Sequence, residues 1–210
     1  CNENLTSLMG LGNLTTINGD VNIGRAHTVW ILGDVTSAGN QLITTLSGLA
    51  NVGYIGGDLL IEGNFALTTL SGLNNEVIIN GDLSIKYNET LSTCEAQSIC
   101  NYLVNPNGAV EIHSNSEGCN NPVEVANNCG FTLTCLPYGN YYFLNQIDID
   151  EFQFNFPSCD EINGNVYIYG SDITNLNGLS SISSIDGDLR IGRSIVGINP
   201  FLTSLSGLEG

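Results

Sequence analysis

The chain has 210 residues, of which 21 are acidic and 4 are basic, and its formal net charge is −17. A protein that binds nucleic acid or an anionic membrane surface needs clustered Lys and Arg, but the four cations here are scattered singly. The composition therefore argues against both classes of partner.

The leucine pattern reveals a repeat. Leu46, Leu70 and Cys94 stand 24 residues apart, and each copy continues with a spaced aliphatic pair and then Gly-Asp-(Leu/Val)-x-Ile. Glycines at two fixed places in each period would break a helix, whereas the alternation in the last piece is typical of a short strand with one buried face. We expect such strands at 19–23, 57–61, 81–85, 164–168 and 187–191.

These strands are expected to lie side by side in a parallel sheet, because a single coil cannot bury its own apolar face and about three or more must stack. Two insertions interrupt the spacing. One lies within 25–41 and contains Trp30, and the other adds 5 residues between Leu176 and Leu205. Both follow a strand, so we expect them at the same edge of the stack, where repeat proteins commonly carry binding loops.

The pattern changes after Cys94. The spacing of apolar residues predicts a short helix over 95–103, a strand over 109–113 and one or two helical turns over 122–128. A helix and disulfides at this point would cover the exposed end of the stack, as a terminal cap must.

Seven cysteines in an acidic chain favour an oxidising compartment. No Cys-x-x-Cys pair occurs, so the spacing of Cys94, Cys100, Cys119 and Cys129 favours disulfides over zinc ligands. We expect Cys94 to pair with Cys119 or Cys129 and Cys100 to pair with the other. The sequence alone does not choose between the possible pairings of four cysteines.

A second unit begins after residue 130. Cys135 and Cys159 are expected to form a disulfide around a short helix over 146–154. The later repeats match the earlier ones at an offset of 168 residues, so we assign 1–130 to the C-terminal part of one module and 131–210 to the N-terminal part of another. Both termini fall inside a repeat, and we expect the chain to stack on further repeats of a longer chain.

Three features resemble receptor L-domain repeats, the leucine-rich-repeat-like modules of insulin- and EGF-type receptors, and particularly their tandem versions in Bacteroidetes surface proteins. They are the repeat, the cysteine-rich cap from Cys94 to Gly130, and the Cys-Leu-Pro opening at Cys135. The resemblance implies a mainly β fold, a right-handed parallel β-solenoid with short helical, disulfide-stapled caps. It also implies a secreted or outer-surface protein with a binding or adhesive role, and it brings no catalytic residues.

The middle residue of each strand points away from the core and varies between copies, so a ligand would be recognised there. The candidate ligand-facing positions are Asn22, Leu60, Ser84, Glu111, Tyr167 and Arg190, with Trp30 of the first insertion. Ordinary exposure to solvent explains the same positions without any ligand. Tyr167, close to Tyr169, is the best local hint, because exposed aromatic rings stack on sugars and anchor protein interfaces.

A column of acids follows glycine at the same point of four copies, at Asp20, Asp58, Asp82 and Asp188. Stacked carboxylates would repel one another unless they cap turns, accept from backbone amides or hold cations, and we favour turn capping over calcium. His27 and His113 have no matched partner. The sequence therefore predicts no metal, no cofactor and no catalytic residue.

We expect a non-catalytic extracellular binding or adhesion module whose ligand is an unknown protein or glycan. One alternative is a carbohydrate-active β-solenoid enzyme, since parallel solenoids also carry hydrolases and lyases on clustered acids. Another is a structural spacer. No apolar run approaches the roughly 20 residues needed to span a bilayer, so no membrane insertion is expected within this segment.

Overall fold

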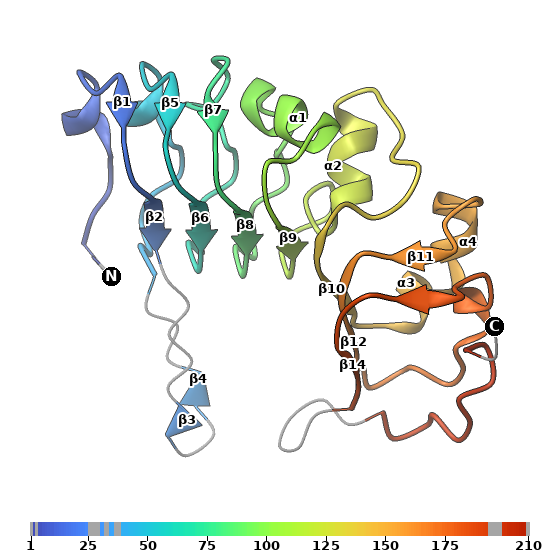
Figure 1. Cartoon of the computed structure of the whole chain (residues 1–210). Coiled ribbons are helices and arrows are strands. Elements are labelled where there is room, and N and C mark those ends of the chain that lie inside the picture. The colour runs from blue at the N-terminus through green and yellow to red at the C-terminus, as the bar shows by residue number, and fades with distance from the viewer. Residues whose placement is uncertain are drawn as a thin grey trace. The chain divides into compact units, whose positions relative to one another are not determined.

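The computed structural model describes residues 2, 4–24, 39–192 and 199–208, together with the backbone of 30–31 and 34–35. The chain divides into two compact units, Cys1–Thr132 and Leu133–Gly210 (Figure 1). Both units consist mainly of parallel strands with a few short helices, as predicted. The assignment of the units to two L-domain-like modules stays a prediction.

Four parallel strands form the main sheet of the first unit. They are β2 (Val21–Gly24), β6 (Leu59–Glu62), β8 (Leu83–Lys86) and β9 (Val110–His113). Leu59 of β6 pairs with Leu83 of β8, which pairs with Val110 of β9, so equivalent residues lie 24 and then 27 positions apart. The predicted parallel strands of this unit are confirmed.

A second, narrower parallel sheet precedes the main strands along the coils. Its strands are β1 (Thr16–Ile17), β5 (Tyr54–Ile55) and β7 (Ile78–Ile79). The short 3-10 helices η1 (Met9–Leu11) and η2 (Ser47–Leu49) precede β1 and β5 in the chain. Figure 1 shows these strands in one row and the main strands in another. The arrangement is compatible with a parallel β-solenoid.

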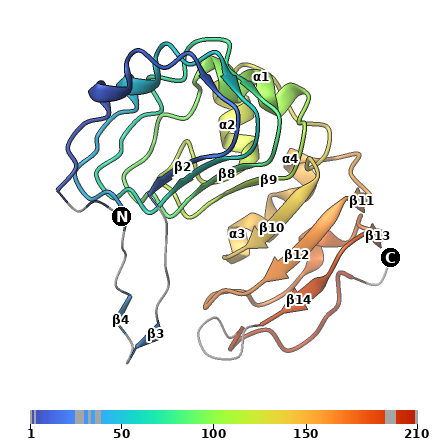
Figure 2. The same cartoon turned by 60° about the vertical axis from the view of Figure 1, so that its left-hand side comes forward.

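Two helices follow the regular coils. Helix α1 (Gln97–Val104) lies against β7, across the first unit from the main strands (Figure 2), and α2 (Pro122–Asn128) lies against α1 and β9. Helix α2 begins at this point because Pro122 suits a first helical position and the Asn121 side chain accepts a hydrogen bond from the Glu124 N–H. Both predicted helices are confirmed.

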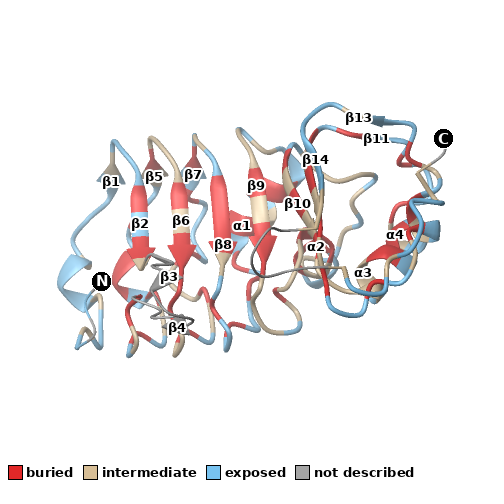
Figure 3. Cartoon of the chain, turned by 90° about the horizontal axis from the view of Figure 1, so that it is seen from below, coloured by how far each residue is buried: buried red, intermediate tan, exposed pale blue. Residues whose placement is uncertain are grey.

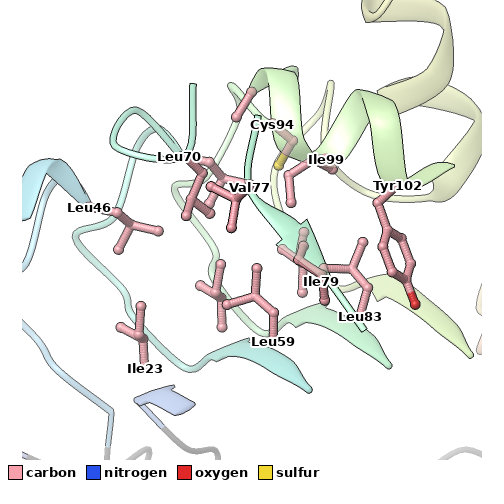
Figure 4. Packing of buried hydrophobic residues seen from close by; sticks show 14 of the residues in the cluster. Ile23, Leu46, Leu59, Leu70, Val77, Ile79, Leu83, Cys94, Ile99 and Tyr102 are labelled. Atoms are coloured by element: carbon pink, nitrogen blue, oxygen red, sulfur yellow. The ribbon is translucent and has the colours of Figure 1, made fainter. Parts of the chain in front are cut away.

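The inward-facing residues of the first unit form a continuous core. Leu46, Leu70 and Cys94, at the predicted 24-residue spacing, are at most 1% exposed (Figure 4). Leu59 and Leu83 begin their strands fully buried, and Figure 3 shows buried positions recurring on neighbouring strands. Because each coil packs onto the next, the burial depends on stacking rather than on any one coil.

Three disulfides join six of the seven cysteines. Cys94 pairs with Cys119 and Cys100 with Cys129, which resolves the alternatives that the sequence left open, and Cys135 pairs with Cys159 as predicted. The sequence separations run from 24 to 29 residues, and loops of this length contribute roughly 3–4 kcal/mol each on the chain-entropy model. Cys1 lies outside the described residues.

Thiol labelling checks these bonds. Alkylation of the unreduced, denatured protein is expected to label none of the six bridged cysteines, because a disulfide sulfur offers no thiolate. Reduction before alkylation is expected to add six labels to the intact mass. Six labels without reduction would show that the bonds do not form, and peptide mapping of the bridged fragments would expose any other pairing.

A ladder of aspartates joins successive coils of the first unit. The Asp20 carboxylate accepts from the backbone N–H of Asp58 at 2.9 Å, Asp58 accepts from that of Asp82 at 2.8 Å, and Asp82 accepts from that of Ala109 at 2.7 Å. The prediction that these aspartates cap their own turns is therefore wrong, because each carboxylate accepts from a backbone N–H of the next coil. The backbone donors also account for the stacked carboxylates without a cation.

A second ladder consists of asparagines, which the sequence prediction missed. Asn40, Asn64, Asn88 and Asn115 follow the main strands, and the first three are at most 5% exposed. Asn64 donates from Nδ2 to Asn88 Oδ1 at 3.1 Å, and Asn88 donates in turn to Asn115 Oδ1 at 3.0 Å. The last two spacings, 24 and 27 residues, match the offsets from β6 to β8 and from β8 to β9, and Asn40 lies another 24 residues before Asn64, so the same periodicity could have identified them.

The second unit repeats the arrangement on a smaller scale. Its main parallel sheet comprises β10 (Gly139–Phe143), β12 (Gly164–Ile168) and β14 (Leu189–Ile191), and β11 (Glu161–Ile162) pairs in parallel with β13 (Ser184–Ile185). Its helices are α3 (Gln146–Asp150), α4 (Phe152–Asn155) and the 3-10 helix η3 (Asn177–Leu179).

Two expectations for the second unit differ from the structure. The helix predicted over 146–154 is two helices, because Glu151 ends α3 before α4 begins. Strand β10 was not predicted, because Gly-Asn-Tyr-Tyr-Phe lacks the Gly-Asp-Leu-x-Ile signature. Within 25–41, β3 (Trp30–Ile31) pairs antiparallel with β4 (Asp34–Val35). The expected placement of both insertions at one edge lies outside the described residues.

Candidate functional site

The predicted ligand-facing positions lie in register across the main sheets. In the first unit, each residue pairs with the next in a row across the sheet that comprises Asn22, Leu60, Ser84 and Glu111. In the second unit, Tyr167 pairs with Arg190. The structure thus brings together four of the predicted residues in one row and two in another. The side chain of Trp30 lies outside the described residues.

Ser84 is buried, so the prediction that it is available to a partner is wrong. Its residue surface is 6% exposed, and its Oγ donates toward Glu62 Oε1 at 3.1 Å and Glu111 Oε2 at 3.3 Å. The longer side chains of the flanking strands extend over the small serine. Of the other predicted positions, Asn22 and Arg190 are exposed, and Leu60, Glu111 and Tyr167 are half-buried.

The residues around Ser84 form a polar cluster, which consists of Glu62, Ser84, Lys86, Glu111 and His113. Lys86 Nζ lies 2.6 Å from Glu111 Oε2 and 3.5 Å from Glu62 Oε1, and His113 Nε2 lies 3.4 Å from Glu111 Oε1. Glu111 therefore interacts with a serine, a lysine and a histidine. His113, which the sequence left without a partner, lies within this network and also contacts Ser114 Oγ through Nδ1.

Three members of the polar cluster were missed at the sequence level. Glu62, Lys86 and His113 are the last residues of β6, β8 and β9, and they pair in register. Residues two positions apart on a strand share a face, so each lies beside the middle residue that the sequence prediction singled out. Extending that prediction by two positions along each strand would have found the cluster.

Burial of Lys86 and its acidic neighbours act in opposite directions on its pKa. Burial disfavours the ammonium and would lower the pKa, but the hydrogen bond to Glu111 and the charges of Glu111 and Glu62 outweigh it and raise the pKa above 10.5. Lys86 therefore stays protonated at neutral pH. One cation serves two carboxylates, and the cluster is held together by that sharing.

The backbone next to the polar cluster adopts an uncommon conformation. Tyr87 and Ser114 directly follow β8 and β9 with φ values of 57° and 54°, whereas Gly63 takes the equivalent place after β6 with φ of 68°. A side chain in this left-handed region costs roughly 1–2 kcal/mol. The Tyr87 ring meets His113 edge-on at 5.2 Å between centroids, so its side chain packs against the cluster.

Lys86→Met is expected to be less stable than the unsubstituted chain at neutral pH, because it leaves Glu62 and Glu111 without their shared cation. The folded pKa of Lys86 lies above its ordinary 10.5, so its stabilisation is fully present below 10.5 and is lost as pH rises through the folded pKa. Denaturant titrations of both proteins at a series of pH values measure the difference. The difference in stability should shrink above about pH 10.5. A difference that is constant with pH would contradict the charge-based explanation.

The second unit carries a tyrosine–arginine patch, which consists of Tyr142, Tyr167, Arg190 and Asp188. The rings of Tyr142 and Tyr167 stack with centroids 4.8 Å apart and planes inclined by 12°, and Arg190 Cζ lies 5.6 Å from the centre of the Tyr167 ring. Arg190 also pairs with Asp188 at 3.2 Å. Because β10 and β14 flank β12, Tyr142 and Arg190 cover opposite faces of Tyr167.

This geometry changes the interpretation of Tyr167. A sugar that stacks on an aromatic ring needs an uncovered ring face, but both faces of Tyr167 already have neighbours. The ring instead presents its edge and its hydroxyl group. Tyr169, which the sequence analysis noted together with Tyr167, contacts Tyr142 rather than Tyr167. The Tyr169 and Tyr142 rings meet edge-on with centroids 6.2 Å apart.

Within the described ranges, no group of three or more His, Cys, Asp or Glu side chains is placed to hold a metal ion. No helix in that part of the chain is long and apolar enough to cross a membrane. No protein-family model matches the chain, and neither does any curated protein or solved structure.

Proposed function

We propose that the chain is a non-catalytic binding or adhesion module of a secreted or cell-surface protein, built on a right-handed parallel β-solenoid of the receptor L-domain kind. One observation carries the proposal. The buried inward residues of the main strands are all apolar, whereas the outward residues in register differ from coil to coil, from Asn22 and Leu60 to Tyr167 and Arg190. A uniform scaffold with a varied outer row is the arrangement that repeat proteins use for binding.

The disulfides support an oxidising, extracellular location. Six bridged cysteines in a chain of this size fit a secreted or surface protein, because cytosolic thiols are kept reduced. The polar cluster supports the non-catalytic part of the proposal. A carboxyl group that acts as a general acid or base must exchange a proton with substrate, but Glu111 is already engaged by Ser84, Lys86 and His113.

An array of immobilised glycans and extracellular proteins tests the proposal. We expect at least one ligand whose binding falls with Leu60→Glu or Arg190→Glu, since both substitutions alter the outer rows. Leu42→Glu is the matched control, because Leu42 is 47% exposed and lies outside the main strands. Binding that Leu42→Glu weakens equally would place the ligand elsewhere, and an array without any ligand would favour the structural spacer.

The carbohydrate-active alternative makes a separate prediction. Glu62 and Glu111 are the acid pair it would use, because both lie beside Lys86 and Ser84. Incubation with neutral and acidic polysaccharides is expected to release no reducing ends or unsaturated products. Turnover that disappears in the Glu62→Gln, Glu111→Gln double variant would overturn the non-catalytic proposal.

A further inference from the structure

The tyrosine–arginine patch holds its side chains in fixed positions before any ligand arrives. Tyr167 lies between the Tyr142 ring and the Arg190 guanidinium, and Arg190 is further tied to Asp188. A neighbouring pair in the same sheet is fixed as well, since Asn165 donates to Asn140 Oδ1 at 2.8 Å and accepts from the Asp188 N–H at 2.7 Å. Side chains ordered in advance lose little conformational entropy on binding.

The composition of the patch is that of a protein-binding hot spot. Tyrosine and arginine are enriched among the residues that dominate protein–protein affinity. The side chains of Arg190 and Asp188 are 64% and 65% exposed. The guanidinium has five N–H donors and uses one nitrogen toward Asp188, so it retains donors for backbone carbonyls of a partner. With both faces of Tyr167 covered, these edges and donors suit a polypeptide better than a pyranose ring.

The charge of the second unit identifies the kind of polypeptide. The described part of the second unit contains eight carboxylates, at Asp148, Asp150, Glu151, Asp160, Glu161, Asp172, Asp186 and Asp188, and Arg190 is the one Lys or Arg in the same residues. All of these acids except Asp148 are exposed. Such a surface attracts a cationic partner and repels an acidic one.

We infer that the tyrosine–arginine patch anchors a polypeptide partner with a basic surface, whose Lys and Arg side chains pair with exposed carboxylates of the second unit while Tyr167 and Arg190 form the central contact. The inference rests on the proposed binding function and specifies its ligand class. It names a protein partner where the sequence left protein and glycan open.

Selection from a displayed library of random short peptides, at near-physiological salt, tests the inference on the full chain. The peptides recovered should be rich in Lys and Arg, and their affinity should fall as salt rises. Tyr167→Ala and Arg190→Ala should each weaken binding by roughly thirtyfold or more, the loss expected for a hot-spot residue. Tyr138→Ala is the matched control, because Tyr138 is 63% exposed and lies outside the main strands, and it should bind normally.

The outcomes separate this inference from the proposed function. Circular dichroism and melting curves establish that each variant is folded before its affinity is compared. Peptides without a basic excess, or basic peptides that bind Tyr167→Ala undiminished, would overturn the inference. Glycan binding that depends on Tyr167 would also overturn it while leaving the binding module intact. The absence of any patch-dependent ligand would remove the inference alone, whereas the absence of any ligand for the whole chain would remove the proposed function as well.

Discussion

Leu70→Ala is expected to lower the free energy of unfolding by roughly 2–5 kcal/mol, because it removes buried methyl groups and leaves a cavity between coils. Leu70 is 1% exposed and lies in the ladder with Leu46 and Cys94, so the loss is felt on both sides of its own coil. Urea denaturation of the variant and the unsubstituted chain, followed by circular dichroism, measures the difference.

Leu42→Ala is the control for this prediction. Leu42 is 47% exposed, and truncation of an exposed leucine is expected to change stability by no more than about 0.5 kcal/mol. Equal effects of the two substitutions would mean that the inside and the outside of the coil have been assigned the wrong way round. A large effect of Leu70→Ala alone supports a core that depends on coil stacking.

Asn88→Ala is expected to destabilise the chain by about 3 kcal/mol or more, which is a large effect for one polar residue. Asn88 is fully buried, and its Nδ2 donates to the Ile61 carbonyl at 2.9 Å while its Oδ1 accepts from the Asn64 N–H at 3.0 Å. Alanine leaves both backbone groups without these partners inside the protein. Each unsatisfied buried group costs roughly 1–3 kcal/mol.

Two further variants distinguish lost hydrogen bonds from lost volume. Asn88→Asp keeps the shape of the side chain but places a carboxylate oxygen against the Ile61 carbonyl, so it should be at least as destabilising as alanine. Asn80→Ala should cost less than about 1 kcal/mol, because Asn80 is exposed and its side-chain amide donates to the Tyr54 hydroxyl at 2.8 Å. If Asn88→Asp were neutral, the ladder would not depend on the donors of Asn88.

The two predictions separate two ways in which the coils are joined. Leucines such as Leu70 bury apolar surface between coils without choosing an exact offset, whereas each asparagine bonds specific backbone groups of its neighbours. The Asn ladder follows the change of offset from 24 to 27 residues between β8 and β9, where Asn115 continues it after Asn88. The polar ladder therefore fixes the register that the apolar core alone would leave loosely specified.

The candidate sites depend on that register. The polar cluster exists because Glu62, Lys86 and His113 are brought into line across three strands, and Tyr142 stacks on Tyr167 because β10 and β12 pair at that residue. A shift of one residue would turn these side chains to the other face. The proposed function of this chain is therefore tied to coil stacking, even though the proposed binding residues lie on the outside.

The sequence by itself determined the repeat, the type and parallel order of the signature strands, the buried leucine ladder, the two helices of the cap and the bridge between Cys135 and Cys159. Each of these follows from periodicity or from local capping signals, which involve residues close together in the chain or at one constant spacing. Strand β10 was not predicted because its sequence departs from the Gly-Asp-Leu-x-Ile signature.

Only the tertiary structure decided how neighbouring coils use their polar side chains. It chose Cys119 rather than Cys129 as the partner of Cys94, buried Ser84 between two glutamates, and covered both faces of Tyr167. The physical reason is that these outcomes depend on the length and reach of side chains from different strands at a particular register. A periodic pattern shows that a residue points outward, but only the packed neighbours determine what part of it a partner can touch.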